Sequence, residues 1–197
     1  MATITAEMVK TLREQSGAGV MECKRALEET GGDIDKAAAI LKERGQAAAA
    51  KRADREAHDG LVASYIHTGG RIGVLIEVNC ETDFVARTDE FQKLVRDLAM
   101  QVAGLRPLYP TIDSIPADEL EAKKAELAAS DTVAGKPEGV RTQIVEGQLK
   151  KWFAEVVLLE QPFRDQDRTV GQLVTDAIAR TGENIKVRRF VRFELGE

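Results

Sequence analysis

The stretch that decides the fold reads Glu77-Val78-Asn79-Cys80-Glu81-Thr82-Asp83-Phe84-Val85-Ala86-Arg87. The residues before it alternate between apolar and other side chains, which predicts a half-buried strand that stops at Asn79. The apolar face of this strand comprises Ile72, Val74, Ile76 and Val78. A helical pattern begins near Asp89, so a strand-to-helix junction lies between the two elements. The junction places a carboxylate beside a large aromatic, Asp83 and Phe84, where side chains leave the scaffold and can meet a partner.

The composition is that of an ordinary soluble protein. The chain has 197 residues, of which 43% are hydrophobic and 31% are charged, which is enough apolar material for one core and a small additional domain. Its net charge of -5 disfavours nucleic-acid binding, because that function usually needs a basic face to replace the counterions of the phosphates. A protein partner or a small ligand fits this composition better.

The two cysteines, Cys23 and Cys80, fall in separate expected elements and lack metal-ligand spacing. They indicate buried or half-buried free thiols in a reducing compartment rather than a zinc site or a disulfide scaffold. The two histidines, His58 and His67, belong to no metal-ligand or nucleophile pattern. The sequence from Met1 shows neither a basic leader nor an apolar run of membrane-spanning length. We expect a cytoplasmic protein with no metal and no cofactor, which contacts neither a membrane nor nucleic acid directly.

Residues 1 to about 45 are predicted to form a three-helix bundle. Thr5 and Asp33 are expected to cap the first and third helices, and Gly31-Gly32 and Gly45 to end the second and third. Each helix is too short to be stable alone, so the three must pack together. The apolar faces comprise Met8, Val9 and Leu12, then Val20, Cys23 and Leu27, and finally Ile34, Ala37, Ala38 and Leu41.

A linker with some helical tendency is expected over 46–59, where alanines give way to mixed basic and acidic residues. Acids interrupt its basic residues and no aromatics lie between them, which favours a solvated tether over an RNA contact. The core domain spans 60–197 and opens with a β-hairpin. Its strands, 61–67 and 71–79, flank Thr68-Gly69-Gly70, whose glycines supply the positive φ that a tight turn requires.

Helices are expected to cover one face of this small antiparallel sheet. The most regular pattern starts at Asp89, which forms a plausible capping pair with Gln92. Further helices are predicted over 116–129, over a longer segment closed by Pro162, and after a cap at Thr169. The predicted fold class is α+β, with an N-terminal three-helix bundle joined to a core of a small antiparallel sheet packed with helices.

The chain ends in a further predicted strand over 184–195. Its odd-numbered residues are apolar except Arg189, and its even-numbered residues from Lys186 onward are charged except Phe190. This alternation predicts Phe190 on the wetter face, although a single exposed apolar residue also arises by chance.

Two blocks of the sequence resemble the signatures of a known family. The junction, Thr82-Asp83-Phe84-Val85, resembles the TDFV signature of the elongation factor Ts family, and the right helix follows it. A second block, LREQSGAGVMECKRAL at 12–27, resembles the family's other signature. It departs at Ser16, where the family usually has Thr, and at Val20, where Met is common. Two further segments, 149–163 and 187–195, are also similar to the family, so the resemblance reaches the C-terminus.

The resemblance implies a guanine nucleotide exchange factor of bacterial translation. In the family, the junction enters the G domain of elongation factor Tu, disturbs the magnesium site and helps to expel GDP. The residues that would dislocate the magnesium are Thr82, Asp83, Phe84 and Val85. The N-terminal bundle would adopt a ubiquitin-associated-like fold and touch the same G domain, and a further domain of the GTPase would also be contacted. The candidate contact residues of the N-terminal bundle are Lys10, Arg13, Val20 and Met21.

The length of the chain, set beside the family, implies self-association. Many members carry two related core subdomains and a coiled-coil insertion, whereas this chain has room for one core, as in the family's short form. In that form two chains associate, so the resemblance implies a homodimer that binds two molecules of elongation factor Tu. The terminal strand and Phe190 are the candidate interface.

The residues alone leave alternatives open. Phe84 is equally well explained as a core residue that covers the end of the sheet, and Met21 as a side chain that fills core space. Val20 and Met21 are adjacent and point about 100° apart on a helix, so one of the two is expected to be exposed.

Rival functions also stay open. An enzyme could use Glu81 and Asp83 as a carboxylate pair, but no second catalytic constellation or phosphate-binding glycine loop accompanies them. A pure adaptor, whose bundle binds one protein and whose core binds another, predicts GTPase binding without faster nucleotide release. Ubiquitin binding by the small bundle would rest on architecture alone.

Overall fold

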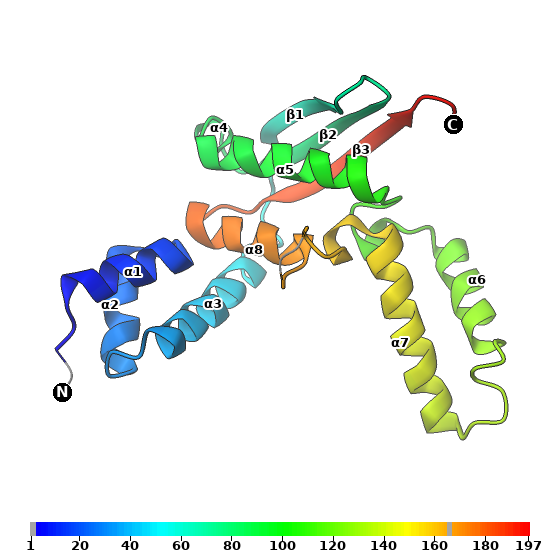
Figure 1. Cartoon of the computed structure of the whole chain (residues 1–197), viewed down its shortest axis with the longest axis horizontal. Coiled ribbons are helices and arrows are strands. Elements are labelled where there is room, and N and C mark those ends of the chain that lie inside the picture. Colours follow the sequence, from blue (N-terminus) through cyan, green and yellow to red (C-terminus); the bar gives the residue numbers. More distant parts are fainter. Residues whose placement is uncertain (1–2, 165–166) are drawn as a thin grey trace. The chain divides into compact units, whose positions relative to one another are not determined.

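The computed structural model describes residues 3–164 and 167–197 (Figure 1). These residues contain eight α-helices and one three-stranded antiparallel sheet, so the predicted α+β class is confirmed. Contacts divide the chain into two compact units. The first unit comprises the described residues of Met1–Gly60, Asn79–Gln92 and Val174–Lys186, and the second comprises those of Leu61–Val78, Lys93–Leu173 and Val187–Glu197. Among the described helices, none combines the length and apolar character that a membrane span requires.

The first unit contains the predicted three-helix bundle of α1 (Ala6–Ser16), α2 (Val20–Glu29) and α3 (Ile34–Ala50). Both predicted caps are confirmed, because Thr5 accepts a hydrogen bond from the third N–H of α1 at 3.2 Å and Asp33 accepts one in α3 at 3.0 Å. The three helices lie together in one bundle (Figure 1). Its apolar core comprises Leu12, Cys23, Ala26, Leu27, Ala37 and Leu41.

The prediction that Gly45 ends the third helix is wrong, because α3 continues to Ala50. Four alanines follow Gln46, and alanine has the highest helix propensity of all residues, so the helix extends through them. Gly45 serves packing instead. A Cβ at this position would lie 3.2 Å from the Cβ of Ala179, which belongs to the same unit.

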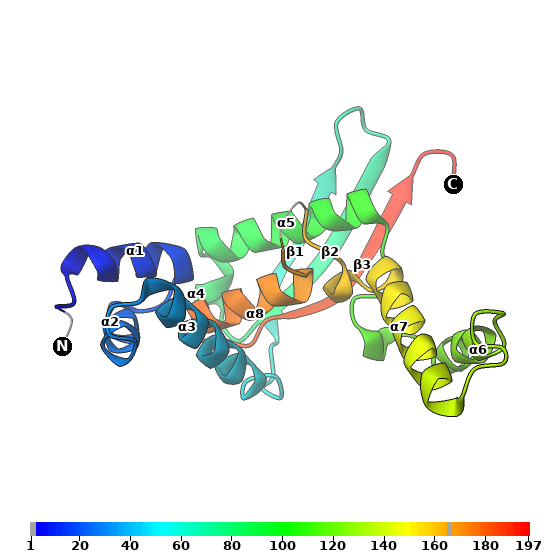
Figure 2. The same cartoon turned by 60° about the horizontal axis from the view of Figure 1, so that its bottom comes forward.

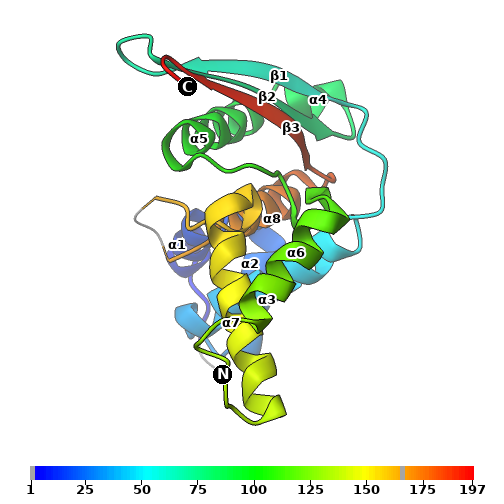
Figure 3. The ribbon, with the colours of Figure 1, turned by 90° about the vertical axis from the view of Figure 1, so that its right-hand side faces the viewer.

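The sheet has the order β1-β2-β3 and lies mainly in the second unit. β1 (Asp59–Ile66) and β2 (Ile72–Cys80) form the predicted hairpin, and β3 (Lys186–Glu194) pairs with β2. α5 (Asp89–Leu105) runs along one face of the sheet (Figure 2 and Figure 3). The alternation predicted for β2 is confirmed by its buried residues, Val74, Ile76 and Val78.

α5 begins where the sequence predicts, but its cap is different. The hydroxyl oxygen of Thr88 accepts a hydrogen bond from the N–H of Phe91 at 3.3 Å. The side-chain amide of Gln92 donates to the carbonyl oxygen of Arg87 at 3.3 Å instead of pairing with Asp89. Thr88 is therefore the capping residue, and Asp89 lies one residue inside the helix.

Two helices of the second unit form an antiparallel hairpin (Figure 3), α6 (Ala117–Ala128) and α7 (Glu138–Val156). The first of these confirms the helix predicted near 116–129. The second ends at Val156, before a short 3-10 helix at Leu158–Glu160, so the prediction that Pro162 closes it is wrong. The structure describes both helices in full, and neither contains a fully buried residue.

α8 (Val170–Thr181) follows the predicted cap. Oγ1 of Thr169 accepts a hydrogen bond from the N–H of Gln172 at 3.2 Å, and this prediction is confirmed. The helix ends at Thr181, and the predicted stop, Gly182, follows it with a φ of 75°, the left-handed conformation that glycine adopts without strain.

The burial predicted for the terminal strand is wrong beyond Arg189. Val187 is buried as predicted, but Val191 and Phe193 are 41% and 69% exposed. The side chain of Arg192, which was expected on the wetter face, is only 9% exposed. The two faces of the strand have therefore exchanged along its length.

A local irregularity explains this exchange. Arg188 and Arg189 both contact the carboxylate of Glu77, at 3.2 Å and 2.7 Å. Consecutive residues of a regular strand point to opposite faces, so two adjacent exposed arginines that reach one carboxylate indicate a β-bulge, and one extra residue reverses the faces of the strand after it. Phe190, predicted on the wetter face, is half-buried.

Candidate functional site

The predicted junction folds as a single helical turn, α4 (Asp83–Ala86), in the first unit. Thr82 caps this turn, because its Oγ1 accepts a hydrogen bond from the N–H of Val85 at 3.4 Å. Val85 is 7% exposed, whereas Phe84 is 78% exposed, the highest value among the large apolar side chains of the described residues. The turn thus buries Val85 and presents Phe84 to solvent.

Asp83 lies beside Phe84 on the exposed side of the turn. Its carboxylate forms an ion pair with Arg87 at 2.6 Å, and the two side chains are 60% and 79% exposed. An ion pair this exposed contributes little to stability. The carboxylate can therefore exchange Arg87 for another cation or hydrogen-bond donor at small cost, and the turn offers an apolar and an acidic group together.

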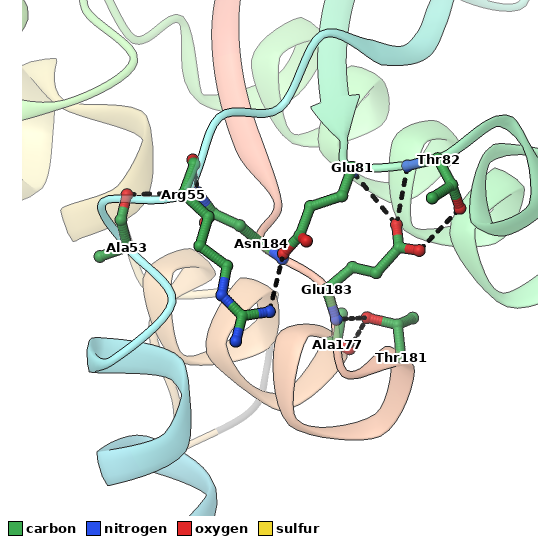
Figure 4. A network of polar contacts seen from close by, with 8 residues as sticks. All are labelled: Ala53, Arg55, Glu81, Thr82, Ala177, Thr181, Glu183 and Asn184. Carbon is green, nitrogen blue, oxygen red and sulfur yellow. Dashed lines mark hydrogen bonds and ion pairs between the residues drawn. The ribbon is translucent and has the colours of Figure 1, made fainter.

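A carboxylate distant in the sequence holds the backbone before the turn. The side chain of Glu183 accepts hydrogen bonds from the N–H groups of Glu81 and Thr82, both at 3.1 Å (Figure 4). It also accepts a hydrogen bond from the hydroxyl of Thr82 at 2.6 Å. Hydrogen bonds to an ionised acceptor are stronger than those between neutral groups. The three residues belong to the first unit.

A second set of contacts fixes the segment that follows α8. The N–H of Asn184 donates to the carboxylate of Glu81 at 2.6 Å, and its side-chain amide donates to the carbonyl oxygens of Ala53 and Arg55 at 3.2 Å and 2.7 Å (Figure 4). The guanidinium of Arg55 lies 3.5 Å from the same carboxylate. Asn184 is 2% exposed, so water does not compete for its hydrogen bonds.

Cys80 lies at the base of the turn. Its thiol is buried and donates to the carbonyl oxygen of Thr82 at 3.2 Å. Burial, and then the negative charge of Glu183, raise the pKa of the Cys80 thiol to about 11. The thiol is therefore protonated at neutral pH and reacts slowly. The prediction that both Cys80 and Cys23 are buried free thiols is confirmed.

The residues expected to bind a partner from the bundle also lie at the surface. Val20 and Met21 are 52% and 65% exposed, so both of them face solvent, and Met21 does not fill core space. Lys10, Arg13 and Val20 line an open hollow of about 770 Å³. Arg180 of α8 lines the same hollow and belongs to the same unit.

The second unit has an open face of its own on the sheet. Leu75 alternates with the buried residues of β2 and is 47% exposed, so it points away from them. Val62, Leu75, Phe190 and Val191 border a hollow of about 380 Å³. The exposed large apolar residues of this sheet face are Val62, Ile66, Leu75, Val191 and Phe193.

Sequence reasoning missed the residues that hold the turn, namely Glu183, Asn184 and Arg55. Glu183 is 101 residues from Thr82, and no motif links the two positions. The available signal was the polar pair Glu183 and Asn184. These residues directly follow Gly182, the predicted helix stop, and their side chains can accept and donate hydrogen bonds. That signal gives no partner.

These features describe an α+β protein whose candidate binding site is an exposed turn held by a polar network. In the described residues, no group of three or more His, Cys, Asp or Glu side chains is placed to hold a metal ion. A family model described as "Elongation factor TS" matches residues 2–197. The chain belongs to the elongation factor Ts family, and the resemblance seen in its two sequence blocks is confirmed.

Individual relatives agree with the family model. The elongation factor Ts of Heliobacterium modesticaldum is 57% identical over 195 residues, which cover 98% of this chain and 91% of the relative. That of Carboxydothermus hydrogenoformans is 56% identical, with 98% and 90% covered. That of Rubrobacter xylanophilus is 52% identical over 191 residues, with 96% and 97% covered.

Proposed function

We propose that the chain is a guanine nucleotide exchange factor for elongation factor Tu in translation elongation. It binds the GDP-bound GTPase in the cytoplasm, disturbs the magnesium and phosphate site and promotes GDP release, without bond chemistry of its own. Membership of the family supports this function. The observation that carries it is the 78% exposure of Phe84 on a turn that is otherwise fixed.

Phe84 is proposed to act as an apolar wedge between helices of the partner's G domain. Burying a phenylalanine contributes about 1.5–3 kcal/mol, and truncating an aromatic hot spot costs about 2–4 kcal/mol. Since about 1.4 kcal/mol corresponds to a factor of ten, either value changes nucleotide release many-fold. The alternative that Phe84 is a core residue at the end of the sheet is wrong, given its exposure.

The other residues of the signature have complementary roles in this proposal. Asp83 anchors the turn in the partner or competes for the groups that organise magnesium and phosphates, since its carboxylate is engaged by an exposed ion pair with Arg87 that is easily replaced. Thr82 caps the turn, and the buried Val85 holds it against its own unit. Because Phe84 is 78% exposed, it can enter the partner with little loss of contacts inside this chain.

Exchange by this route is reciprocal. The bound exchange protein lowers the affinity of the GTPase for GDP by some factor, and bound GDP lowers the affinity of the GTPase for the exchange protein by the same factor. A tightly bound exchange factor is therefore released when a nucleotide rebinds, as happens when GTP arrives.

The N-terminal bundle is proposed to make a second contact with the G domain, and a further domain of the GTPase completes the interface. Val20 and Met21 supply exposed apolar groups for this contact. Lys10 and Arg13 supply positive charge beside them, at the hollow that Val20 also lines. Such a basic edge attracts acidic groups on a partner.

Two chains are proposed to associate through the open sheet face, so that the complex contains two copies of each protein. In a twofold dimer the same patch meets itself, and the apolar side chains of the face leave water together. Phe190, the interface residue proposed from the sequence, borders this face, but Val191 and Phe193 are the more exposed side chains.

The rival functions make different predictions. Glu81 and Asp83 are engaged separately, the first by Asn184 and the second by Arg87, which does not favour a shared catalytic carboxylate pair. The adaptor remains the second candidate, because exposed surfaces on both units would also serve it. It predicts binding to the GTPase with no change in nucleotide release.

The test is release of a fluorescent GDP analogue from elongation factor Tu, measured by stopped flow with the wild-type chain and with Phe84→Ala. We expect wild type to accelerate release and the variant to lose about tenfold or more of that acceleration. Leu108→Ala is the control, since it also truncates an exposed apolar side chain, at 63% exposure, but on the second unit rather than on the turn. Acceleration unchanged by Phe84→Ala would remove Phe84 from the mechanism, and no acceleration by wild type would favour the adaptor.

A further inference from the structure

We propose that Glu183 is the positioning residue of the exchange turn, and that its carboxylate fixes the direction in which Phe84 leaves the surface. This inference rests on the proposed exchange function. Glu183 lies in the segment between α8 and β3, outside the sequence signature, and its side chain does not belong to the α4 turn that it holds.

The carboxylate of Glu183 satisfies the backbone just before α4. This backbone leaves the sheet at Cys80 and must direct two N–H groups, those of Glu81 and Thr82, to some acceptor. Both N–H groups donate to Oε2 of Glu183 at 3.1 Å. The peptide between β2 and α4 is therefore held at two consecutive positions by one oxygen atom.

The other carboxylate oxygen holds the cap of the turn. The hydroxyl of Thr82 donates to Oε1 of Glu183 at 2.6 Å, while its oxygen accepts from the N–H of Val85 at 3.4 Å. The bond to Glu183 thus sets the rotamer in which the hydroxyl caps α4. Since Phe84 lies between Thr82 and Val85, fixing these two residues fixes the direction of its Cα–Cβ bond.

Glu183 is itself fixed. Its own N–H donates to Oγ1 of Thr181 at 3.3 Å, and that hydroxyl donates to the carbonyl oxygen of Ala177 at 2.8 Å (Figure 4). On its other side, Asn184 is held by the carboxylate of Glu81 and by two carbonyl oxygens of the segment after α3. The end of α8 is therefore a rigid support, and the turn is attached to it by the side chain of Glu183.

The contacts separate this role from general stability. Glu183 is only partly buried and contributes no apolar contact to the bundle core, whose residues lie on α1, α2 and α3. Removing its carboxylate leaves that core in place and leaves two N–H groups and one hydroxyl without their acceptor. The expected consequence is a turn that samples several directions and delivers Phe84 less often in the productive one.

Two substitutions distinguish hydrogen-bond geometry from charge. Glu183→Gln keeps the length, so its carbonyl oxygen can accept from both N–H groups and its amide can donate to the hydroxyl oxygen of Thr82. Glu183→Asp keeps the charge but is one methylene shorter, so it cannot hold all three groups. Nucleotide release from elongation factor Tu should remain within about twofold of wild type for Gln and fall about tenfold for Asp and for Ala.

A double-mutant cycle tests whether Glu183 acts through Phe84. Adding Glu183→Ala to Phe84→Ala should lower release no further than Phe84→Ala alone, because the positioned group is already absent. Glu43→Ala is the matched control, since it removes an exposed carboxylate in α3 of the same unit and should leave release unchanged. Independent losses that multiply in the double variant would overturn the inference.

A readout without the GTPase completes the test. The Cys80 thiol is buried and bonded to Thr82, so alkylation of Cys80, followed by mass spectrometry, reports opening of this backbone. Glu183→Asp keeps the charge and should speed Cys80 alkylation by about tenfold over wild type. Glu183→Ala and Glu183→Gln both remove the charge that raises the pKa of the thiol, so Ala is compared with Gln and should react about tenfold faster than it. Cys23, in the bundle core, is the internal control and should react as in wild type. Phe84→Ala could abolish accelerated release while Glu183→Ala and Glu183→Asp leave it intact. That outcome would overturn the positioning role and leave the exchange function standing.

Discussion

Phe84 and Phe193 are the same residue type and are similarly exposed, at 78% and 69%, but their surroundings differ. Phe84 stands on a single helical turn beside Asp83, and a polar network holds the turn from behind. Phe193 lies on a strand, on a face shared with other apolar side chains of the sheet. The first is a projecting aromatic on a fixed support, and the second is part of a broad apolar surface.

The difference indicates two kinds of partner. A single projecting aromatic needs a pocket, which a different protein can provide. A broad apolar face is complementary to a second copy of itself, because a twofold axis places identical groups against each other. The comparison therefore supports the proposals that Phe84 contacts the GTPase and that the sheet face serves self-association.

The largest expected effect comes from placing a charge on each surface in turn. Phe193→Glu should weaken self-association by a factor of about 100 or more, because a carboxylate would have to be buried in an apolar interface. Phe84→Glu should leave the molar mass unchanged and abolish accelerated GDP release. Light scattering at micromolar concentration measures the first property and stopped flow the second. A monomeric wild type, or a dimer in Phe193→Glu, would break the comparison.

The sequence predicted the elements of the first surface better than those of the second. The strand that ends near Asn79, the junction and the helix from Asp89 were all predicted, because each follows from local periodicity. Local pattern left the exposure of Phe84 open, because core and surface readings of one aromatic look alike in sequence, and the family resemblance was what favoured the surface. Glu183 was missed since its contact with Thr82 is made through tertiary structure alone.

The sheet face shows where alternation fails. β2 obeys its pattern, whereas β3 changes faces after Arg189, where two arginines meet one glutamate. An inserted residue reverses every later side chain, so the pattern named Phe190 while the structure exposes Val191 and Phe193. The division into domains at 1–45, 46–59 and 60–197 stays a prediction.

A smaller effect tests whether the base of the α4 turn is closed to water, as a fixed support for Phe84 requires. The pKa of Cys80 is raised from 9.0 to about 11, mainly by burial, so the protonated thiol is favoured until well above neutral pH. Since the thiolate is the reactive form, alkylation of Cys80 at pH 8 should be slow and should rise about tenfold per pH unit up to that pKa. Peptide-resolved alkylation between pH 7 and pH 11, with denatured chain as reference, measures it. A rate that levels off near pH 9 would mean that the thiol is open to water and that the base of the turn is loose.

The smallest expected effect concerns the loop between α1 and α2, on the unit that carries Phe84. Gly17 has a φ of 69°, and a Cβ added there would lie 2.4 Å from Cδ of Arg180, which is paired with Glu90 at 2.7 Å. Gly31 has a similar φ of 63° with nothing within 4 Å, so it provides a matched control. Gly31→Ala should cost about 1 kcal/mol in the free energy of unfolding, from backbone strain alone.

Gly17→Ala should cost about 1 kcal/mol more than Gly31→Ala, because Arg180 must also move and give up its geometry with Glu90. Urea unfolding of the three chains gives both differences. The additional loss should disappear when Gly17→Ala is made in an Arg180→Ala background, because the Arg180 side-chain atoms that the new Cβ would clash with are then absent. Equal losses at the two glycines would mean that the Arg180 side chain moves aside at no cost. The loop before α2 would then be held less firmly than the α4 turn that carries Phe84.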